Sequence, residues 1–208
     1  MLEEAASTIS NMDKGFLYNI KNLIVNPQKL IKSYLHGKRS EIFNPLSFFL
    51  ISITLYLIAE SAYKELLPEN TTVGSNESDS YSLGYKAGRF IKKYFNYFWG
   101  LSVVWLSLST KLLFRRFNFA EHLTINSFII GQATLAGILT YLLYQYPVMF
   151  DPIVYLIISV EIFIFYRKTD DTSVIVTKSI FSTLIFFLII VATTIGLGKI
   201  LTFYEVSV

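Results

Sequence analysis

The sequence predicts an all-α membrane protein, a polytopic bundle of about five transmembrane helices preceded by amphipathic helices. Two features of its composition predict this fold class: 53% of the 208 residues are hydrophobic and only 16% are charged, whereas a soluble domain carries about a quarter charged residues. The third observation is that the charges collect in short segments between long runs that contain almost none. That pattern is typical of helices whose apolar side chains face lipid.

Five apolar runs are long enough to cross a membrane. A helix needs about 17–25 mostly apolar residues to cross a hydrocarbon core of about 30 Å. The runs that meet this requirement are 43–59, 94–110, 123–146, 148–166 and 179–198. We therefore expect each of them to form one span.

Local sequence supports each run in turn. In the first, Asn44 can cap the helix N-terminus and Pro45 leaves no N–H group unsatisfied there. The second is aromatic at its start, and the third has no ionisable side chain other than tyrosine. The fourth carries Glu161 in its interior, and Pro147 separates it from the third, so the two form either a helical hairpin or one kinked element. The fifth is apolar throughout.

Two basic amphipathic helices are predicted before the first run. Between residues 14 and 25, one stripe at helical spacing is apolar: Phe16, Leu17, Ile20, Leu23 and Ile24. Asn26-Pro27 restarts a helix, and Gly37 is expected to cap its C-terminus. Helices of this kind lie in the membrane interface with their lysines toward anionic headgroups. Docking on the cytoplasmic end of the bundle is the alternative, and the sequence favours neither.

The basic residues predict the orientation, because cytoplasmic loops carry the excess of lysine and arginine. With the N-terminus in the cytoplasm, twelve of these residues lie inside and six outside. The chain is thus expected to be N-terminus in and C-terminus out, and the basic cluster at 86–93 is the exception. This divides the chain into a basic interfacial segment, 1–41, and a transmembrane bundle, 42–208, with a polar extracytoplasmic loop at about 64–83.

Composition and motifs argue against several classes of function. The net charge of +3 is too small to indicate nucleic-acid binding, and the absence of cysteine excludes disulfides and thiolate metal sites. There is no nucleophile elbow, phosphate-binding glycine loop, zinc-binding His-Glu-x-x-His or paired-carboxylate motif. We therefore expect no catalytic residues, no cofactor and no metal.

Several motifs in the N-terminal part carry a resemblance. They are Lys14-Gly15-Phe16-Leu17-Tyr18, Asn26-Pro27, Tyr34-Leu35-His36-Gly37-Lys38-Arg39 and Asn44-Pro45, joined further on by Glu121-His122. The chain resembles, mainly over 14–60 and more weakly over 117–126, an uncharacterised bacterial integral membrane family, a group defined by a domain of unknown function. The resemblance implies a multi-pass protein of the bacterial cytoplasmic membrane. It does not point to any particular activity. Longer members begin with a zinc ribbon, which this cysteine-free chain cannot form.

Two ionisable residues, one inside the fourth apolar run and one at the end of the second, are candidates for an intramembrane pair. Charges within a bilayer are costly and mark functional sites by default. Glu161 and Lys111 each lie about one to two turns before a basic loop, at similar depth. We expect the two side chains to pair, either as a staple within the bundle or as the lining of a path for an ion or a headgroup.

Three polar residues begin the third run. Glu121, His122 and Asn126 form a candidate polar cluster at the cytoplasmic face. The structural alternative is a helix start, in which Glu121 favours the positive end of the helix dipole. Adjacent helix residues point about 100° apart, so one histidine beside one glutamate is not a metal site.

Gly37, Lys38 and Arg39 are candidates for binding a lipid headgroup or a protein partner. Two cations follow a glycine that would free backbone donors for a phosphate. The alternative is ordinary positive flanking of a membrane span.

The function expected from these features is that of a non-enzymatic integral membrane protein, an accessory, regulatory or membrane-perturbing component. By analogy of size and architecture alone, it could act in a bacterial antiviral defence system. Its expected partners are the bilayer with anionic headgroups, a cytoplasmic protein and a second copy of the chain. The small-residue pairs Ala133/Gly137 and Ala192/Gly196 suit helix contacts in lipid, either within the bundle or between copies of the chain. The rival hypotheses are an oligomeric channel or small transporter lined by Glu161, Lys111, Asn126 and Gln132, and an interfacial lipid-modifying enzyme using Glu121 and His122.

Overall fold

The computed structural model describes residues 15–40, 42–66, 98–167 and 171–206, with side chains up to residue 196. Every regular element within these ranges is a helix, which confirms the all-α fold class. The elements after the helix at 15–25 are α2 (Pro27–Leu35), α3 (Pro45–Leu66), α5 (Ser102–Leu113), α6 (Phe119–Tyr144), the 3-10 turn η1 (Val148–Phe150), α7 (Pro152–Tyr166) and α8 (Thr172–Val206). The predicted loop beyond residue 66, the cluster at 86–93 and residues 94–97 lie outside the described residues.

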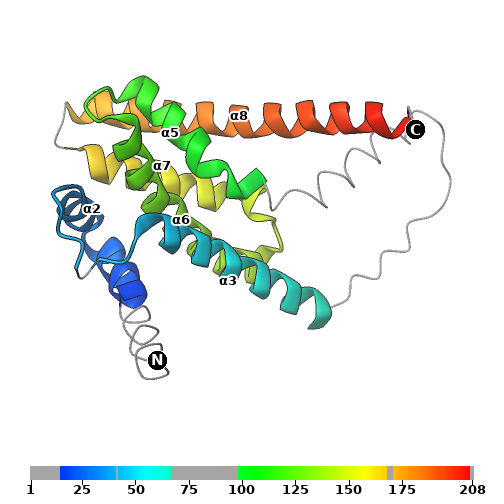
Figure 1. Ribbon diagram of the computed structural model, residues 1–208, viewed down its shortest axis with the longest axis horizontal. Coiled ribbons are helices and arrows are strands. Elements are labelled where there is room, and N and C mark those ends of the chain that lie inside the picture. Colours follow the sequence, from blue (N-terminus) through cyan, green and yellow to red (C-terminus); the bar gives the residue numbers. More distant parts are fainter. Residues whose placement is uncertain (1–14, 41, 67–97, 168–170, 207–208) are drawn as a thin grey trace, which may run out of the picture.

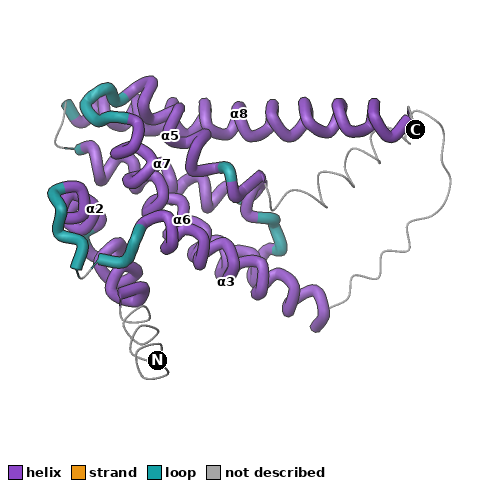
Figure 2. Tube along the Cα trace, in the orientation of Figure 1, coloured by secondary structure: helices purple, strands orange, loops and turns teal. Residues whose placement is uncertain are grey.

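Four of the helices form a bundle, to which the others attach. α5 and α7 each pack against both α6 and α8, and α3 packs along α6. Figure 1 shows α8 along the top of the view, α3 below, and the N-terminal helices gathered at the left. α3, α6 and α8 begin at the end where α5 and α7 finish, and short loops join the helices there (Figure 2). We call this the basic end, because all described lysine and arginine side chains except Lys64 belong to it.

Three helices are long and apolar enough to cross a membrane: α3, α6 and the Thr172–Gly196 part of α8. The second and fourth predicted runs form shorter helices, since α5 has 12 residues and α7 has 15. α7 begins at Pro152 instead of residue 148, because proline is best placed in the first turn of a helix and the Asp151 side chain caps it by accepting from the Ile153 N–H at 2.8 Å. The third and fourth runs therefore form a helical hairpin and not one kinked element.

The N-terminal helices dock on the bundle instead of standing apart from it. Leu23, Leu30 and Ile31 belong to the same buried core as the bundle helices. The Asn19 amide donates to the Phe43 carbonyl at 3.0 Å and its oxygen accepts from the Phe43 N–H at 3.2 Å. The predicted apolar stripe is divided between two faces, because Phe16, Ile20 and Leu23 face the bundle whereas Leu17 and Ile24 are exposed.

Candidate functional site

A buried histidine joins three helices at the basic end. The Nε2 atom of His122 lies 2.9 Å from the Phe114 carbonyl oxygen, and Nδ1 lies 3.0 Å from the Thr110 hydroxyl and 3.2 Å from the Tyr166 hydroxyl. In the neutral ring, Nε2 carries the hydrogen, because a carbonyl oxygen only accepts, and Nδ1 then accepts from a hydroxyl. Groups from α5 and α7 therefore hold the ring of this α6 residue in one neutral tautomer.

Asn126 lies one turn further along α6 and extends this network toward α5. Its amide nitrogen donates to Thr110 Oγ1 at 2.8 Å and to Ser107 Oγ at 3.2 Å. The two hydroxyls in turn donate to carbonyl oxygens within α5. In the part of the chain that the structure describes, the buried Asn126 Oδ1 atom has no hydrogen-bond partner. The network thus ties α5 to α6 and leaves one acceptor unused.

Aromatic rings enclose the network. Tyr166 stacks on Phe114 with ring centroids 4.0 Å apart and an interplanar angle of 13°. The Phe117 ring meets the His122 ring edge-on at 6.2 Å, and Lys178 Nζ lies 5.8 Å from the centre of the Phe114 ring. These contacts bring the ends of α5 and α7 and the starts of α6 and α8 together, so that His122 is fully buried.

The predicted cluster of Glu121, His122 and Asn126 is formed only in part. Glu121 belongs to a capping box, in which its carboxylate accepts from the Asn118 N–H at 2.7 Å and the Asn118 side chain accepts from the Glu121 N–H at 2.9 Å. It therefore has the structural role that a first-turn glutamate favours. His122 and Asn126 are brought together by Thr110, without Glu121.

The predicted pair of Lys111 and Glu161 is not formed. Lys111 Nζ donates to the Phe117 carbonyl oxygen at 2.5 Å, in the loop that follows its own helix. Glu161 is 5% exposed, and neither of its carboxylate oxygens has a hydrogen-bond partner among the described residues. Their similar depth in the bundle was not sufficient to pair Lys111 with Glu161. The lysine side chain is long enough to reach the end of its own helix, where carbonyl groups lack partners.

The Gly37-Lys38-Arg39 segment has a different geometry from the one expected. Gly37 has φ +91°, and its N–H and that of Lys38 donate to the carbonyl oxygens of Tyr34 and Ser33, both at 3.0 Å. This is a Schellman motif, so the predicted helix cap is confirmed, but it uses the donors that were expected to be free. The Arg39 guanidinium lies 5.3 Å from the centre of the Tyr34 ring. The segment therefore offers exposed cations and not a backbone phosphate cradle.

Sequence reasoning missed Thr110, Ser107 and Tyr166 as members of the network. Hydroxyl side chains in membrane helices commonly bond back to the preceding turn, and Thr110 and Ser107 do so as well as accepting from Asn126. The signal that could have found Thr110 is its position directly before Lys111, where a helix ends at a basic loop. Tyr166 sits at the corresponding position in α7, directly before Arg167.

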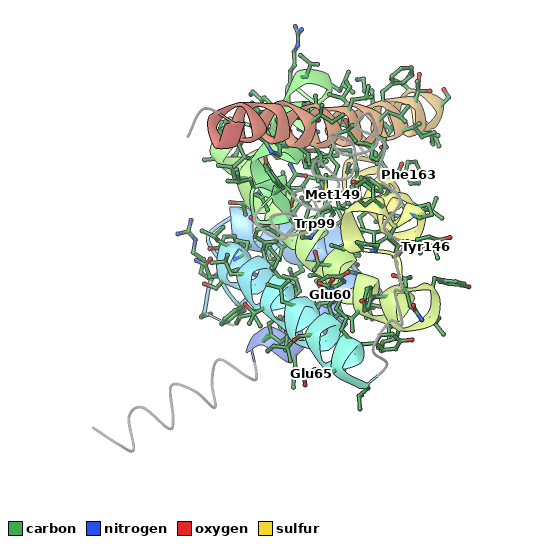
Figure 3. All side chains as sticks on the ribbon, turned by 90° about the vertical axis from the view of Figure 1, so that its right-hand side faces the viewer. Glu60, Glu65, Trp99, Tyr146, Met149 and Phe163 are labelled. Atoms are coloured by element: carbon green, nitrogen blue, oxygen red, sulfur yellow. The ribbon has the colours of Figure 1, made fainter. Side chains whose placement is uncertain are left out.

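A second polar group, also missed, lies at the opposite end of the bundle, which faces the viewer in Figure 3. The buried Tyr56 hydroxyl accepts from the Val148 N–H at 3.0 Å. Thr140 donates a short hydrogen bond to Asp151, which also caps α7. Trp99 Nε1 donates to Thr134 Oγ1 at 2.9 Å. The first two bonds fix the α6–α7 turn, whose low charge gave no sign of them, and the third ties the residues before α5 to α6.

The chemistry available to these groups is limited. Within the described ranges, no three histidine, aspartate or glutamate side chains lie together so that they could hold a metal ion. His122 is enclosed, Glu121 is used in a helix cap, and Lys38 and Arg39 lie exposed on another element. The network of His122 and Asn126 fixes the packing of α5, α6 and α7.

Comparison with known proteins gives one family match. No curated protein and no solved structure matches the chain. A family model described as "Protein of unknown function (DUF3667)" matches residues 13–57. This stretch holds the helix at 15–25, α2, the Schellman motif and the first half of α3. The N-terminal part of the chain is therefore similar to an uncharacterised family.

Proposed function

We propose that this chain is a non-enzymatic integral protein of the bacterial cytoplasmic membrane that presents its basic end to the cytoplasm as an accessory or regulatory component. The observation that carries the proposal is the separation of charge along the bundle, because cations gather on the cytoplasmic side of membrane proteins. The cations that are exposed at this end are Lys21, Lys29, Lys38, Arg39, Arg115, Arg116 and Arg167.

The surface of the bundle supports placement in lipid. Large apolar side chains are exposed on every helix that packs in it, and examples are Leu50, Ile58, Leu108, Leu139, Leu143, Leu156 and Leu188. A soluble protein rarely exposes contiguous apolar patches of this kind, whereas helices in a bilayer do so at no cost. The cationic surface at the basic end would then meet anionic headgroups or a cytoplasmic protein partner.

The absence of cysteine makes the orientation simple to test. We expect the Glu65→Cys variant, at the end opposite the basic end, to react with a membrane-impermeant maleimide in intact bacterial cells. We expect the Arg116→Cys variant to react only after the cells are opened, since both parent side chains are exposed and differ in which end they occupy. The reverse pattern would overturn the orientation, and recovery of the protein in the aqueous fraction without detergent would overturn the membrane assignment.

A cation pathway is the second candidate, and one observation favours it. The Glu161 carboxylate is buried without a partner, and so are Asn126 Oδ1 and Gln132 Oε1, within the part of the chain that the structure describes. Unsatisfied acceptors inside a membrane bundle favour a positively charged ligand. In proteoliposomes we expect cation or proton flux to fall at least about tenfold in Glu161→Gln, as expected for loss of an essential charge, and to persist in the control Glu121→Gln. Absence of flux from the native protein would eliminate this candidate and leave the first.

A further inference from the structure

The helix at residues 15–25 is apolar on two opposite faces. Its inner face meets the bundle through Phe16, whose ring centroid lies 5.1 Å from that of Phe48 and 6.2 Å from that of Phe43. Leu23 and Asn19 on the same face are fully buried. This side of the helix is therefore occupied by the protein itself.

The outer face is covered by nothing in the described part of the chain. Its apolar residues are Leu17, Tyr18, Ile24 and Val25, which are 64%, 41%, 68% and 74% exposed. Positions 17, 21 and 24 follow one another at helical spacing, so Lys21, also exposed, lies in the middle of this face. Four large apolar side chains around one cation are a poor surface for water but suit the boundary between acyl chains and headgroups.

The placement of the helix agrees with that boundary. In Figure 1 the helix at 15–25 runs across the direction of α8 and not along it, at the left-hand, basic end. A helix at this position in a membrane-embedded bundle lies near the plane of the headgroups. Lys29 and Arg39 are exposed on the neighbouring segment, and no acidic side chain is present between residues 15 and 40.

We infer that the outer face of this helix rests on the anionic surface of the membrane that holds the bundle, with Leu17, Ile24 and Val25 among the acyl-chain segments next to the headgroups and Lys21 against lipid phosphate. The inference rests on the proposed membrane location of the protein. A second copy of the chain fits the same face less well, because a symmetric contact would bring two Lys21 side chains together, with no acid among the described residues of this segment to neutralise them.

A fluorescent probe at a single cysteine tests this inference. The Ile24→Cys variant carries an environment-sensitive fluorophore and is placed in nanodiscs of phosphatidylcholine alone or with phosphatidylglycerol. We expect its emission to shift to shorter wavelength, with the larger shift in the anionic discs, and to be quenched at least about twofold by brominated acyl chains, as expected for a residue that penetrates about 5–10 Å into the interface. Ser40→Cys, exposed at the same end but uncharged and within a polar segment, serves as the control position and should show neither effect.

The charge of Lys21 is tested separately. Lys21→Gln, introduced with Ile24→Cys, should reduce the difference between the two lipid compositions by about fivefold in partitioning, since one lysine near an anionic surface contributes about 1 kcal/mol. An emission typical of water in both discs would overturn the inference. A shift that depends on two copies per disc and is not quenched by brominated lipid would assign the face to a second copy instead. Both readouts are independent of which side of the membrane the basic end occupies, so they fail separately from the maleimide test.

Discussion

Replacing His122 by alanine is expected to lower the free energy of unfolding by about 3–5 kcal/mol, the range for removing a large buried ring. The substitution leaves a cavity where α5, α6 and α7 meet, and it removes one hydrogen bond from the Phe114 carbonyl and one from the Tyr166 hydroxyl. The loss of buried hydrogen bonds adds to the cost of the cavity. Denaturation in mixed micelles, followed by circular dichroism, measures the change.

His36→Ala is the matched control for this substitution. His36 is exposed, and its Nδ1 atom lies 2.6 Å from the Lys32 carbonyl oxygen within the same helix end. Loss of such a C-terminal contact costs about 0.3–1 kcal/mol. Equal losses in the two variants would contradict the role given to the buried network, and an unchanged stability of His122→Ala would do so as well.

Gly131→Ala is expected to lower the free energy of unfolding by about 1–3 kcal/mol, the usual cost of overpacking a core. A Cβ atom on Gly131 would lie 2.7 Å from Cδ1 and 2.9 Å from Cε1 of Phe48, and 3.3 Å from the Cα atom of Phe49. The Phe48 ring has little room to move, because it also packs against Phe16 and Phe128. Since this is the contact between α3 and α6, we expect hydrogen exchange to increase first in α3.

Gly196→Ala is the control for backbone and composition. Nothing lies within 4 Å of a Cβ at Gly196, which is exposed in α8. Alanine there should be neutral or stabilise the helix by up to about 1 kcal/mol. If both glycine variants lowered the free energy of unfolding equally, close packing at Gly131 would not be the cause of the loss in Gly131→Ala. A loss of stability in Gly196→Ala alone would indicate a helix contact beyond the described chain.

The sequence was sufficient to predict the helices because a membrane helix satisfies all its backbone hydrogen bonds locally. Long apolar runs therefore located α3, α6 and α8, although their ends differ from the predicted ones by several residues. Hydrophobicity did not predict the break before Pro152, which is specified by proline and by the Asp151 cap. It also could not choose between an interfacial and a docked position for α2, since that depends on bonds such as Gln28 to the Phe165 carbonyl, 137 positions apart.

The candidate sites were harder to predict because they depend on which helices are neighbours. His122 and Asn126 were identified from their residue types, but their partners Thr110 and Tyr166 come from other helices. Depth alone paired Lys111 with Glu161, whereas the structure directs the lysine to its own loop. A glycine in an apolar run gives no sign in the sequence that it is closely packed, and the importance of Gly131 follows only from the position of Phe48.

The unequal lengths of the helices have a consequence for the lipid around them. At about 1.5 Å per residue, the 15 residues of α7 are shorter than a hydrocarbon core of about 30 Å, whereas the 35 residues of α8 exceed it. Mismatch of this kind is relieved by thinning the bilayer beside the short helix and tilting the long one. The protein would then favour thin regions of a membrane and locally compress thicker ones.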